Sequence, residues 1–394
     1  MKPLLLLFIS CCLLACQVDS KSQTDTPAAA AAFKTAAEQL ELYLPLLQGK
    51  RVGVLVNQTS LIGDQHLVDE LLKHGINIVS IFAPEHGFRG DHDAGAKVSS
   101  GTDSKTGLPL LSLYGASKKP SADQMQQLDV IVFDIQDVGV RYYTYISSMH
   151  YVMEAAAEQG VAMLVLDRPN PNGAHTDGPV LDLNFRSFVG MHPIPLLHGM
   201  TVGELALMIK GERWIAAAEQ LQLTVIPMQA YQHAMPYALP VKPSPNLPNA
   251  QAIALYPSLG FFEATPLSIG RGTPFPFQVI GYDKFGLGNF QFMPVSTPGA
   301  ALTPPLMDKA LLGEDLRQVK AAGLDLGYLM RWHTLFTAHN AVFFSSPSFM
   351  DKLAGTDKLR LQIEQGLSEA SIRAGWQTEL QQFKRQRQPY LLYP

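Results

Sequence analysis

The sequence predicts an α/β fold, in which a doubly wound parallel sheet is followed by a smaller α+β domain. Short runs rich in Val and Ile alternate at least four times with segments of helical periodicity, a pattern typical of parallel β-α units. After Pro276 this alternation stops, and short strand-like runs precede two long helical segments. The 394 residues, 47% of them hydrophobic, are enough to build two domains.

The elements of the first region follow from the periodicity of its apolar residues. Gly49 and Gly75 end the first two helices, Ser121 is an expected N-cap, and Thr201 with Glu204 forms a capping box. The predicted strands cover residues 51–56, 77–82, 129–134, 161–166 and 223–227. The predicted helices cover residues 34–47, 66–74, 121–128, 147–159 and 201–218.

Residues 237–276 have no such periodicity and are rich in Pro, Gly and aromatic residues. A long irregular stretch of this kind is usually functional, and its aromatic residues argue against disorder. We place the domain boundary in this stretch, near Pro248. Beyond it, strands are predicted at residues 279–282, 290–295 and 342–344, and helices at 350–365 and 368–387.

The N-terminus has the features of an export signal. Lys2 precedes an apolar run that is too short to remain as a membrane span, so residues 1–15 are predicted to be a signal peptide. The run ends at Leu-Leu-Ala-Cys16, which resembles the lipobox of bacterial lipoproteins and predicts lipidation of Cys16. Residues 16–33 would then be a lipidated flexible tether, and Gln17 favours an outer-membrane lipoprotein facing the periplasm.

Composition and missing motifs exclude several classes of function. All three cysteines lie in the signal region, so a catalytic thiol and a thiolate metal site are excluded. The net charge of −4 and the lack of a basic run argue against nucleic acid. The first predicted β-α turn carries no dinucleotide fingerprint, and no phosphate-binding loop, serine-hydrolase elbow or zinc motif occurs. We therefore expect no cofactor and no metal, and no protein partner can be identified.

Polar residues follow four predicted strands at their carboxyl ends, where parallel sheets bind ligands. Glu85 and His86 stand in a loop that also contains Arg89, and Glu85 has no sequence neighbour that would make it structural. The residues at the other strand ends are Asn57 after the first, Asp134, Asp137 and Arg141 after the third, and Arg168 and Asn170 after the fourth. Because these ends share one edge, we expect the side chains to converge on a crevice.

Structural roles remain open for some of these residues. Asp134 could accept backbone N–H bonds, Arg168 could form an ion pair with Asp167, and His198 could be a satisfied loop histidine. The remaining chemistry is that of carboxylates, and a pair of carboxyl groups is the usual apparatus for cleaving a glycosidic bond.

Several long motifs resemble those of the exo-β-N-acetylmuramidase family of peptidoglycan hexosaminidases, and the resemblance runs from about Leu47 to Tyr393. The motifs are Phe82–Gly90, Phe133–Tyr145, Leu166–Pro171, His198–Thr201, Pro243–Asn246, Gly270–Thr273 and Leu353–Asp357.

This resemblance implies a Rossmann-like catalytic domain at residues 34–248, a smaller domain at 249–394 and a cleft between them. It implies release of N-acetylmuramic acid from the non-reducing end of peptidoglycan fragments. Glu85 matches the leading catalytic carboxylate, and Glu263 is the likelier match for the second. Ile269 stands where the family pattern has an acidic residue before Gly-Arg-Gly-Thr, so this chain departs from the pattern there.

The first hypothesis is therefore an exo-acting glycosidase with Glu85 as the general acid. Asp134 or Glu263 would be the second carboxylate, or would orient the 2-acetamido group of the substrate if that group is the nucleophile. Arg168 or Arg271 would pair with the lactyl carboxylate, and His86 and Asn57 would hold sugar hydroxyls. The predicted substrate-binding residues are Asn57, His86, Arg89, Asp137, Arg141, Arg168, Asn170, His198, Asn246 and Arg271. The second hypothesis is a lipid-anchored protein that binds muropeptides without cutting them.

Overall fold

A computed structural model describes residue 1 and residues 32–85, 87–88, 100–115 and 117–394. The predicted signal peptide, Cys16 and most of the tether lie outside these residues, as do His86 and Arg89. Ala32–Pro394 form a single compact unit. The predicted boundary between two domains near Pro248 therefore stays a prediction.

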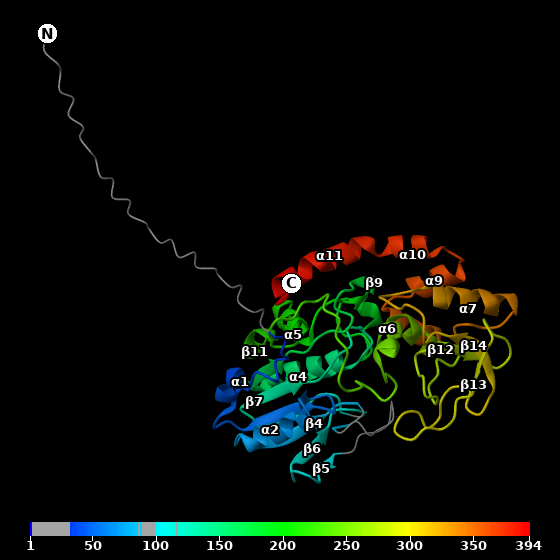
Figure 1. The fold of residues 1–394 in the computed structure, drawn as a ribbon. Helices are drawn as coiled ribbons and strands as arrows, with labels where there is room; N and C mark the ends of the chain where they lie inside the picture. The colour runs from blue at the N-terminus through cyan, green and yellow to red at the C-terminus, as the bar shows by residue number, and fades with distance from the viewer. Residues whose placement is uncertain (2–31, 86, 89–99, 116) are drawn as a thin grey trace. The chain divides into compact units, whose positions relative to one another are not determined.

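The central element is a seven-stranded sheet in the order β11-β8-β7-β1-β4-β6-β5 (Figure 1). Six of its strands are parallel to their neighbours, and the two-residue strand β5 pairs antiparallel with β6 at one edge. The bounds are Val52–Val56 for β1, Ile78–Ala83 for β4, Gly101–Thr102 for β5, Pro109–Ser112 for β6, Val130–Asp134 for β7, Ala162–Leu166 for β8 and Leu223–Ile226 for β11. The predicted doubly wound α/β fold is confirmed.

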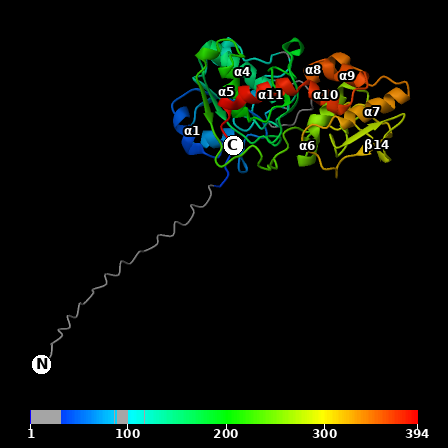
Figure 2. The same ribbon diagram turned by 90° about the horizontal axis from the view of Figure 1, so that it is seen from above.

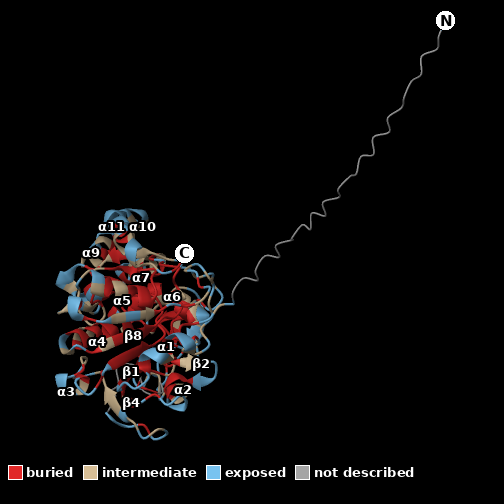
Figure 3. Ribbon diagram, turned by 90° about the vertical axis from the view of Figure 1, so that its left-hand side faces the viewer, coloured by how far each residue is buried: buried red, intermediate tan, exposed pale blue. Residues whose placement is uncertain are grey.

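Helices cover both faces of the sheet, and Figure 3 shows the buried strands between them. One face packs against α1 (Leu40–Leu47) and α2 (Leu67–Lys73), and the other against α3 (Ala122–Met125), α4 (Tyr145–Gln159) and α5 (Val202–Gly211). Within β1, Val54 faces the first group of helices and Leu55 the second, because side chains alternate along a strand. The strands are hydrophobic throughout because both faces are covered.

The carboxyl ends of the strands are bonded to one another. The Thr59 hydroxyl after β1 accepts a hydrogen bond from the Gln136 backbone N–H after β7, at 3.0 Å. The Ser60 hydroxyl donates to the Asp134 carbonyl oxygen, and the Gln136 amide donates to the Pro169 carbonyl oxygen after β8. Many of the polar groups at this edge therefore form hydrogen bonds with one another and join the loops.

Two small antiparallel pairs complete the first region, namely β2 (Leu61–Ile62) with β3 (Gln65–His66), and β9 (Asp177–Val180) with β10 (Pro195–Leu197). The capping box predicted at Thr201 is present, and the predicted N-cap Ser121 forms a capping box as well. The helix α5 ends at Gly211 rather than at residue 218.

The second region contains a three-stranded antiparallel sheet in the order β12-β14-β13, with helices around it. The predicted strand at residues 342–344 is wrong, because Phe343 and Phe344 are buried in an aromatic cluster without pairing to a strand. The bounds are Ala250–Leu259 for α6, Val279–Tyr282 for β12, Phe290–Phe292 for β13, Leu311–Asp315 for β14, Gly327–Ala338 for α7, Pro347–Ala354 for α8, Lys358–Glu364 for α9, Glu369–Gly375 for α10 and Gln377–Arg387 for α11.

Each of the two long C-terminal helices predicted from the sequence is two helices in the structure. The first is broken at Gly355, which has φ +72° at the C-cap of α8. A Cβ atom there would lie 2.7 Å from Nη2 of Arg141, so the glycine also permits a close approach between the two regions. The second is broken at Trp376, whose indole ring is buried.

The last residues of the chain return to the first region, and in Figures 1 and 2 the C-terminus lies beside α5. The Tyr393 hydroxyl donates to Oδ2 of Asp167 at 2.6 Å, and the Leu392 backbone N–H donates to Oε1 of Glu204 at 2.8 Å. Both acceptors are buried. The C-terminal residues therefore stabilise the core of the first region.

Candidate active site

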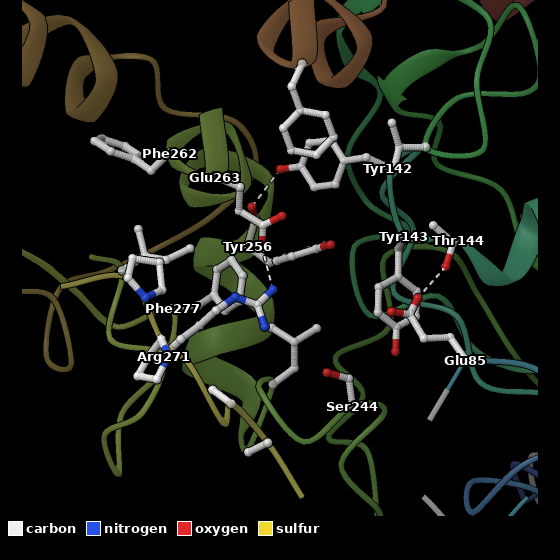
Figure 4. A pocket seen from close by; sticks show the side chains of 18 of the residues that line it. Glu85, Tyr142, Tyr143, Thr144, Ser244, Tyr256, Phe262, Glu263, Arg271 and Phe277 are labelled. Carbon is white, nitrogen blue, oxygen red and sulfur yellow. Dashed lines mark hydrogen bonds and ion pairs between the residues drawn. The ribbon is translucent and has the colours of Figure 1, made fainter. Parts of the chain in front are cut away.

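A pocket of about 540 Å³ lies between residues of the two regions. Figure 4 shows Glu85 and Thr144 on one side of it, and Glu263 and Arg271 on the other. The wall between them is largely aromatic, and residues 300–305 contribute a further side. The pocket therefore brings together two carboxylates that are far apart in the sequence.

Glu85 follows β4, after Pro84 has ended the apolar run of that strand. Its side chain is partly buried and reaches the pocket. Oε1 accepts a hydrogen bond from the Tyr114 hydroxyl at 3.0 Å, and Oε2 accepts one from the Thr144 hydroxyl at 3.1 Å. Each carboxylate oxygen thus has a hydroxyl partner from a different loop.

Glu263 belongs to a short 3₁₀ turn after α6, and Arg271 lies in the Gly-Arg-Gly turn that follows. Nη2 of Arg271 is 2.5 Å from Oε1 of Glu263, and their side chains are 21% and 29% exposed. Burial works against the charge of the Arg271 guanidinium, but the neighbouring Glu263 carboxylate raises its pKa. The guanidinium carbon also lies 5.0 Å from the centre of the Phe277 ring, within the range of a cation–π contact.

Tyrosines form the wall between the two carboxylates. The Tyr142 hydroxyl donates to the Tyr256 and Pro257 carbonyl oxygens at 2.7 and 2.9 Å, and the Tyr143 hydroxyl donates to the Pro243 carbonyl oxygen at 2.8 Å. Burial raises the pKa of both phenols. Because their hydroxyls are bonded to the backbone, the rings are fixed and present apolar surface to the pocket.

The structure places two of the predicted residues, Asp134 and Arg168, away from the pocket in a buried ion pair. Nε of Arg168 lies 2.5 Å from Oδ1 of Asp134, and Nη2 lies 2.8 Å from Oδ2. Their side chains are 0% and 4% exposed, and neither lines the pocket. The partner of Arg168 is Asp134 rather than Asp167, so the ion pair joins the ends of β7 and β8.

Other predicted substrate-binding residues are buried behind the pocket. The Asn57 side-chain oxygen accepts from the Thr59 backbone N–H at 2.9 Å, and the Asn170 amide donates to the Met200 carbonyl oxygen at the same distance. Nδ1 of His198 accepts from the Met200 backbone N–H at 3.2 Å, and burial lowers the pKa of its imidazole to about 3. These contacts hold loops, but the structural alternative for His198 is met only in part, because among the described residues its Nε2 has no hydrogen-bond partner.

Arg141 and Asp137 are also buried in the structure. The Arg141 guanidinium donates to four backbone carbonyl oxygens, including Leu353 and Ala354 at the end of α8. Burial lowers its pKa to about 9. Asp137 accepts from the Gly139 backbone N–H at 2.7 Å, and burial raises the pKa of its carboxyl group to about 7.

Asn246 adjoins the pocket without lining it. Its amide donates to the Ala300 carbonyl oxygen at 2.8 Å, which joins the loop containing Ser244 and Leu247 to residues 300–305. Ile269 is buried and lines the pocket beside Arg271. An apolar side chain therefore occupies the position where the family pattern suggested an acid.

Sequence reasoning missed the groups that hold Glu85 and much of the aromatic wall, namely Tyr114, Thr144, Tyr256 and Phe277. Thr144 was part of a recognised motif, and the aromatic residues at 237–276 were noted as a group. Nothing in the sequence pairs Tyr114 with Glu85, because the contact depends on the adjacency of β6 and β4.

Among the described residues, no group of three or more His, Cys, Asp and Glu side chains is placed to hold a metal ion. In the same part of the chain, every helix is too short or too polar to cross a bilayer.

Comparisons with known proteins cover nearly the whole described chain. A family model described as exo-beta-N-acetylmuramidase NamZ, N-terminal, matches residues 52–251, and its C-terminal counterpart matches residues 254–393. The peptidoglycan beta-N-acetylmuramidase NamZ of Bacillus subtilis (strain 168) is 40% identical over 376 residues, which are 89% of each chain.

Two crystal structures of DUF1343 family proteins from Bacteroides fragilis NCTC 9343 resemble the fold. One has a TM-score of 0.84 and 45% identity, and the other has a TM-score of 0.79 and 30% identity. Each comparison covers 92% of this chain and 99% of the other.

Proposed function

Because the chain belongs to the exo-beta-N-acetylmuramidase NamZ family, we infer that it is an exo-acting glycoside hydrolase that releases N-acetylmuramic acid from peptidoglycan. The observation that supports the chemistry most directly is the pair of carboxylates, Glu85 and Glu263, on opposite sides of one aromatic pocket. Two carboxyl groups flanking a glycosidic bond are the usual means of its hydrolysis.

The partners of the two carboxylates support different roles for them. A guanidinium only donates hydrogen bonds, so Glu263 is the acceptor in its contact with Arg271. A hydroxyl can donate or accept, so Tyr114 and Thr144 are compatible with Glu85 in either protonation state. We therefore assign Glu85 as the general acid and Glu263 as the second carboxylate, which stabilises the positive charge that develops on the sugar.

In the proposed reaction, Glu85 gives its proton to the glycosidic oxygen while the bond between that oxygen and the anomeric carbon breaks. The electron pair of the bond stays with the leaving oxygen. The developing positive charge on the sugar ring is stabilised by Glu263, and either water or the oxygen of the 2-acetamido group attacks the anomeric carbon. Water finally supplies the hydroxyl group of the released sugar.

Arg271 is the residue we propose for the lactyl carboxylate of N-acetylmuramic acid. Only its Nη2 is used by Glu263, and among the described residues no other hydrogen bond is made by its guanidinium. The remaining N–H groups suit a second, planar carboxylate. Arg168 is not proposed for this role, because its guanidinium is buried against Asp134.

The decisive experiment is to incubate the purified protein with a chromogenic β-glycoside of N-acetylmuramic acid. We expect release of the chromophore together with free N-acetylmuramic acid, and slower release by Glu85→Gln at the same concentration. Tight binding by both proteins without any product would instead support the non-catalytic muropeptide-binding protein.

We propose further that the protein is a lipoprotein of the cell envelope, anchored through Cys16 and facing the periplasm. This rests on the lipobox-like Leu-Leu-Ala-Cys16 and on the short apolar run before it. An anchor in the envelope would keep the enzyme beside its polymer substrate.

A further inference from the structure

Thr144 occupies the N-cap position of α4 but does not cap that helix through its side chain. By contrast, Ser121 and Thr201 at the starts of α3 and α5 each form a complete capping box. The Thr144 hydroxyl instead donates to Oε2 of Glu85, at 3.1 Å. A group that would normally stabilise its own helix is thus directed into the pocket.

Tyr114 reaches the other oxygen of the same carboxylate. It follows β6, which is the parallel neighbour of β4, and the Leu113 backbone N–H donates to the Ala83 carbonyl oxygen at 2.8 Å. This extension of the pairing brings the Tyr114 hydroxyl to 3.0 Å from Oε1 of Glu85. Burial and the charge of Glu85 raise the pKa of the Tyr114 phenol, so it keeps its proton and remains a donor.

We propose that Thr144 and Tyr114 are positioning residues that hold the Glu85 carboxyl group by one hydroxyl on each oxygen throughout the catalytic cycle. This proposal rests on the assignment of Glu85 as the general acid. When Glu85 carries its proton on Oε2, that proton is directed at the glycosidic oxygen, while Thr144 continues to donate to the remaining lone pair of Oε2 and Tyr114 to Oε1. The carboxyl group therefore stays aimed at the glycosidic oxygen before and after proton transfer.

The positioning role has two measurable consequences. Loss of either hydroxyl removes one of the two hydrogen bonds described for the Glu85 carboxyl group and makes its orientation less fixed, so kcat should fall about tenfold or more while KM changes little. Loss of a donor to the ionised carboxylate also makes protonation of Glu85 easier, so the alkaline side of the pH profile of kcat, where the general acid loses its proton, should move to higher pH. A residue that only supported the fold would not move the pH profile.

The test compares Thr144→Val, Thr144→Ser and Tyr114→Phe with the wild-type enzyme on the N-acetylmuramic acid glycoside. Thr144→Val keeps the shape of threonine without its hydroxyl, and Thr144→Ser should restore kcat and the pH profile. Tyr390→Phe is the matched control, because the Tyr390 hydroxyl donates to the carboxylate of Glu212 at 2.9 Å, outside the pocket. Its kinetics should equal those of the wild type.

Wild-type kcat and an unmoved pH profile in both Thr144→Val and Tyr114→Phe, with a reduced kcat in Glu85→Gln, would overturn the positioning role and leave the proposed function standing. Full activity of Glu85→Gln would overturn the proposed function itself. Tyr114→Phe serves as the independent variant if Thr144→Val does not fold, since it tests the other hydroxyl without touching α4.

Discussion

Glu85 is the residue on which the proposed chemistry depends most. Glu85→Gln keeps the shape of the side chain but cannot donate the proton, and general acid catalysis contributes about 10²–10⁴ in rate. We therefore expect kcat on a natural disaccharide to fall at least about 10²-fold, with little change in KM. An aryl glycoside with a good leaving group needs less protonation, so kcat on that substrate should fall less. Steady-state kinetics on the natural disaccharide and on the aryl glycoside measure this difference. Equal losses on both would contradict the acid role.

Arg271 should decide which sugars the enzyme accepts. Arg271→Gln removes the charge and the planar fork, so the preference for N-acetylmuramic acid over N-acetylglucosamine glycosides should fall about 10–100-fold in kcat/KM. Competition between the two chromogenic glycosides measures this ratio. Arg317→Gln is the control, because Arg317 also pairs with a carboxylate, Asp315, but on the exposed surface. An unchanged ratio in Arg271→Gln would mean that another group reads the lactyl carboxylate.

At the scale of single elements, the loop after β7 contains a carboxyl group whose titration affects stability. Burial raises the pKa of Asp137 to about 7, above the usual value near 3.8 that applies in the unfolded chain. Between these values the folded protein binds a proton that the unfolded chain has released. The free energy of unfolding should therefore decrease as the pH rises from about 4 to about 7, by at most about 1.4 kcal/mol per pH unit from this group.

Asp137→Asn removes this titration and resembles the protonated carboxyl group. Its free energy of unfolding, measured in urea at several pH values, should increase relative to that of the wild type as the pH rises through this window. A difference between the two proteins that does not change with pH would show that Asp137 is not protonated in the folded state.

Elements of the first region were predictable because local sequence decides them. The Val- and Ile-rich runs became β1, β4, β7, β8 and β11, and the Ser121 N-cap and the Thr201 capping box form as expected. The predictions failed where distant contacts decide the local structure. Gly355 breaks a helical pattern at the point where the Arg141 side chain from the first region approaches, and no local pattern encodes that approach.

The same distinction applies to the candidate site. Glu85 could be found because a polar residue directly follows a buried strand, and Glu263 followed only from the family resemblance. Asp134 and Arg168 follow strands in the same way, yet the adjacency of β7 and β8 makes them partners of each other. Spacing along the chain cannot distinguish a carboxylate that meets the substrate from one that meets an arginine.

At the scale of the whole molecule, the C-terminal residues join the second region back to the sheet of the first. The Tyr393 hydroxyl donates to Asp167 and accepts from the Met228 backbone N–H at 2.9 Å. Tyr393→Phe should lower the free energy of unfolding by about 1–3 kcal/mol, because both buried partners lose a hydrogen bond. Urea unfolding measures this change. Tyr390→Phe is the control, because Tyr390 is partly exposed and loss of its hydroxyl should lower the free energy of unfolding less. Equal stability of Tyr393→Phe and the wild type would mean that the tail is not part of the cooperative core.

The attachment of the whole molecule to the envelope depends on Cys16, which lies outside the described residues. If the lipobox is processed, two linked steps take place, in which the thiol is lipidated and the signal peptide is then removed before Cys16. Cys16→Ala should therefore leave a protein without acyl chains, and one that no longer sediments with membranes. Fractionation of cells that express each form, followed by immunoblotting, measures this, and activity on the chromogenic glycoside should appear in the soluble fraction.

Cys12→Ala is the matched control, because it changes a neighbouring thiol in the apolar run but leaves the lipobox intact. Membrane association that persists in Cys16→Ala would refute the lipid anchor, since the run from Leu4 to Leu14 is too short to span a bilayer by itself.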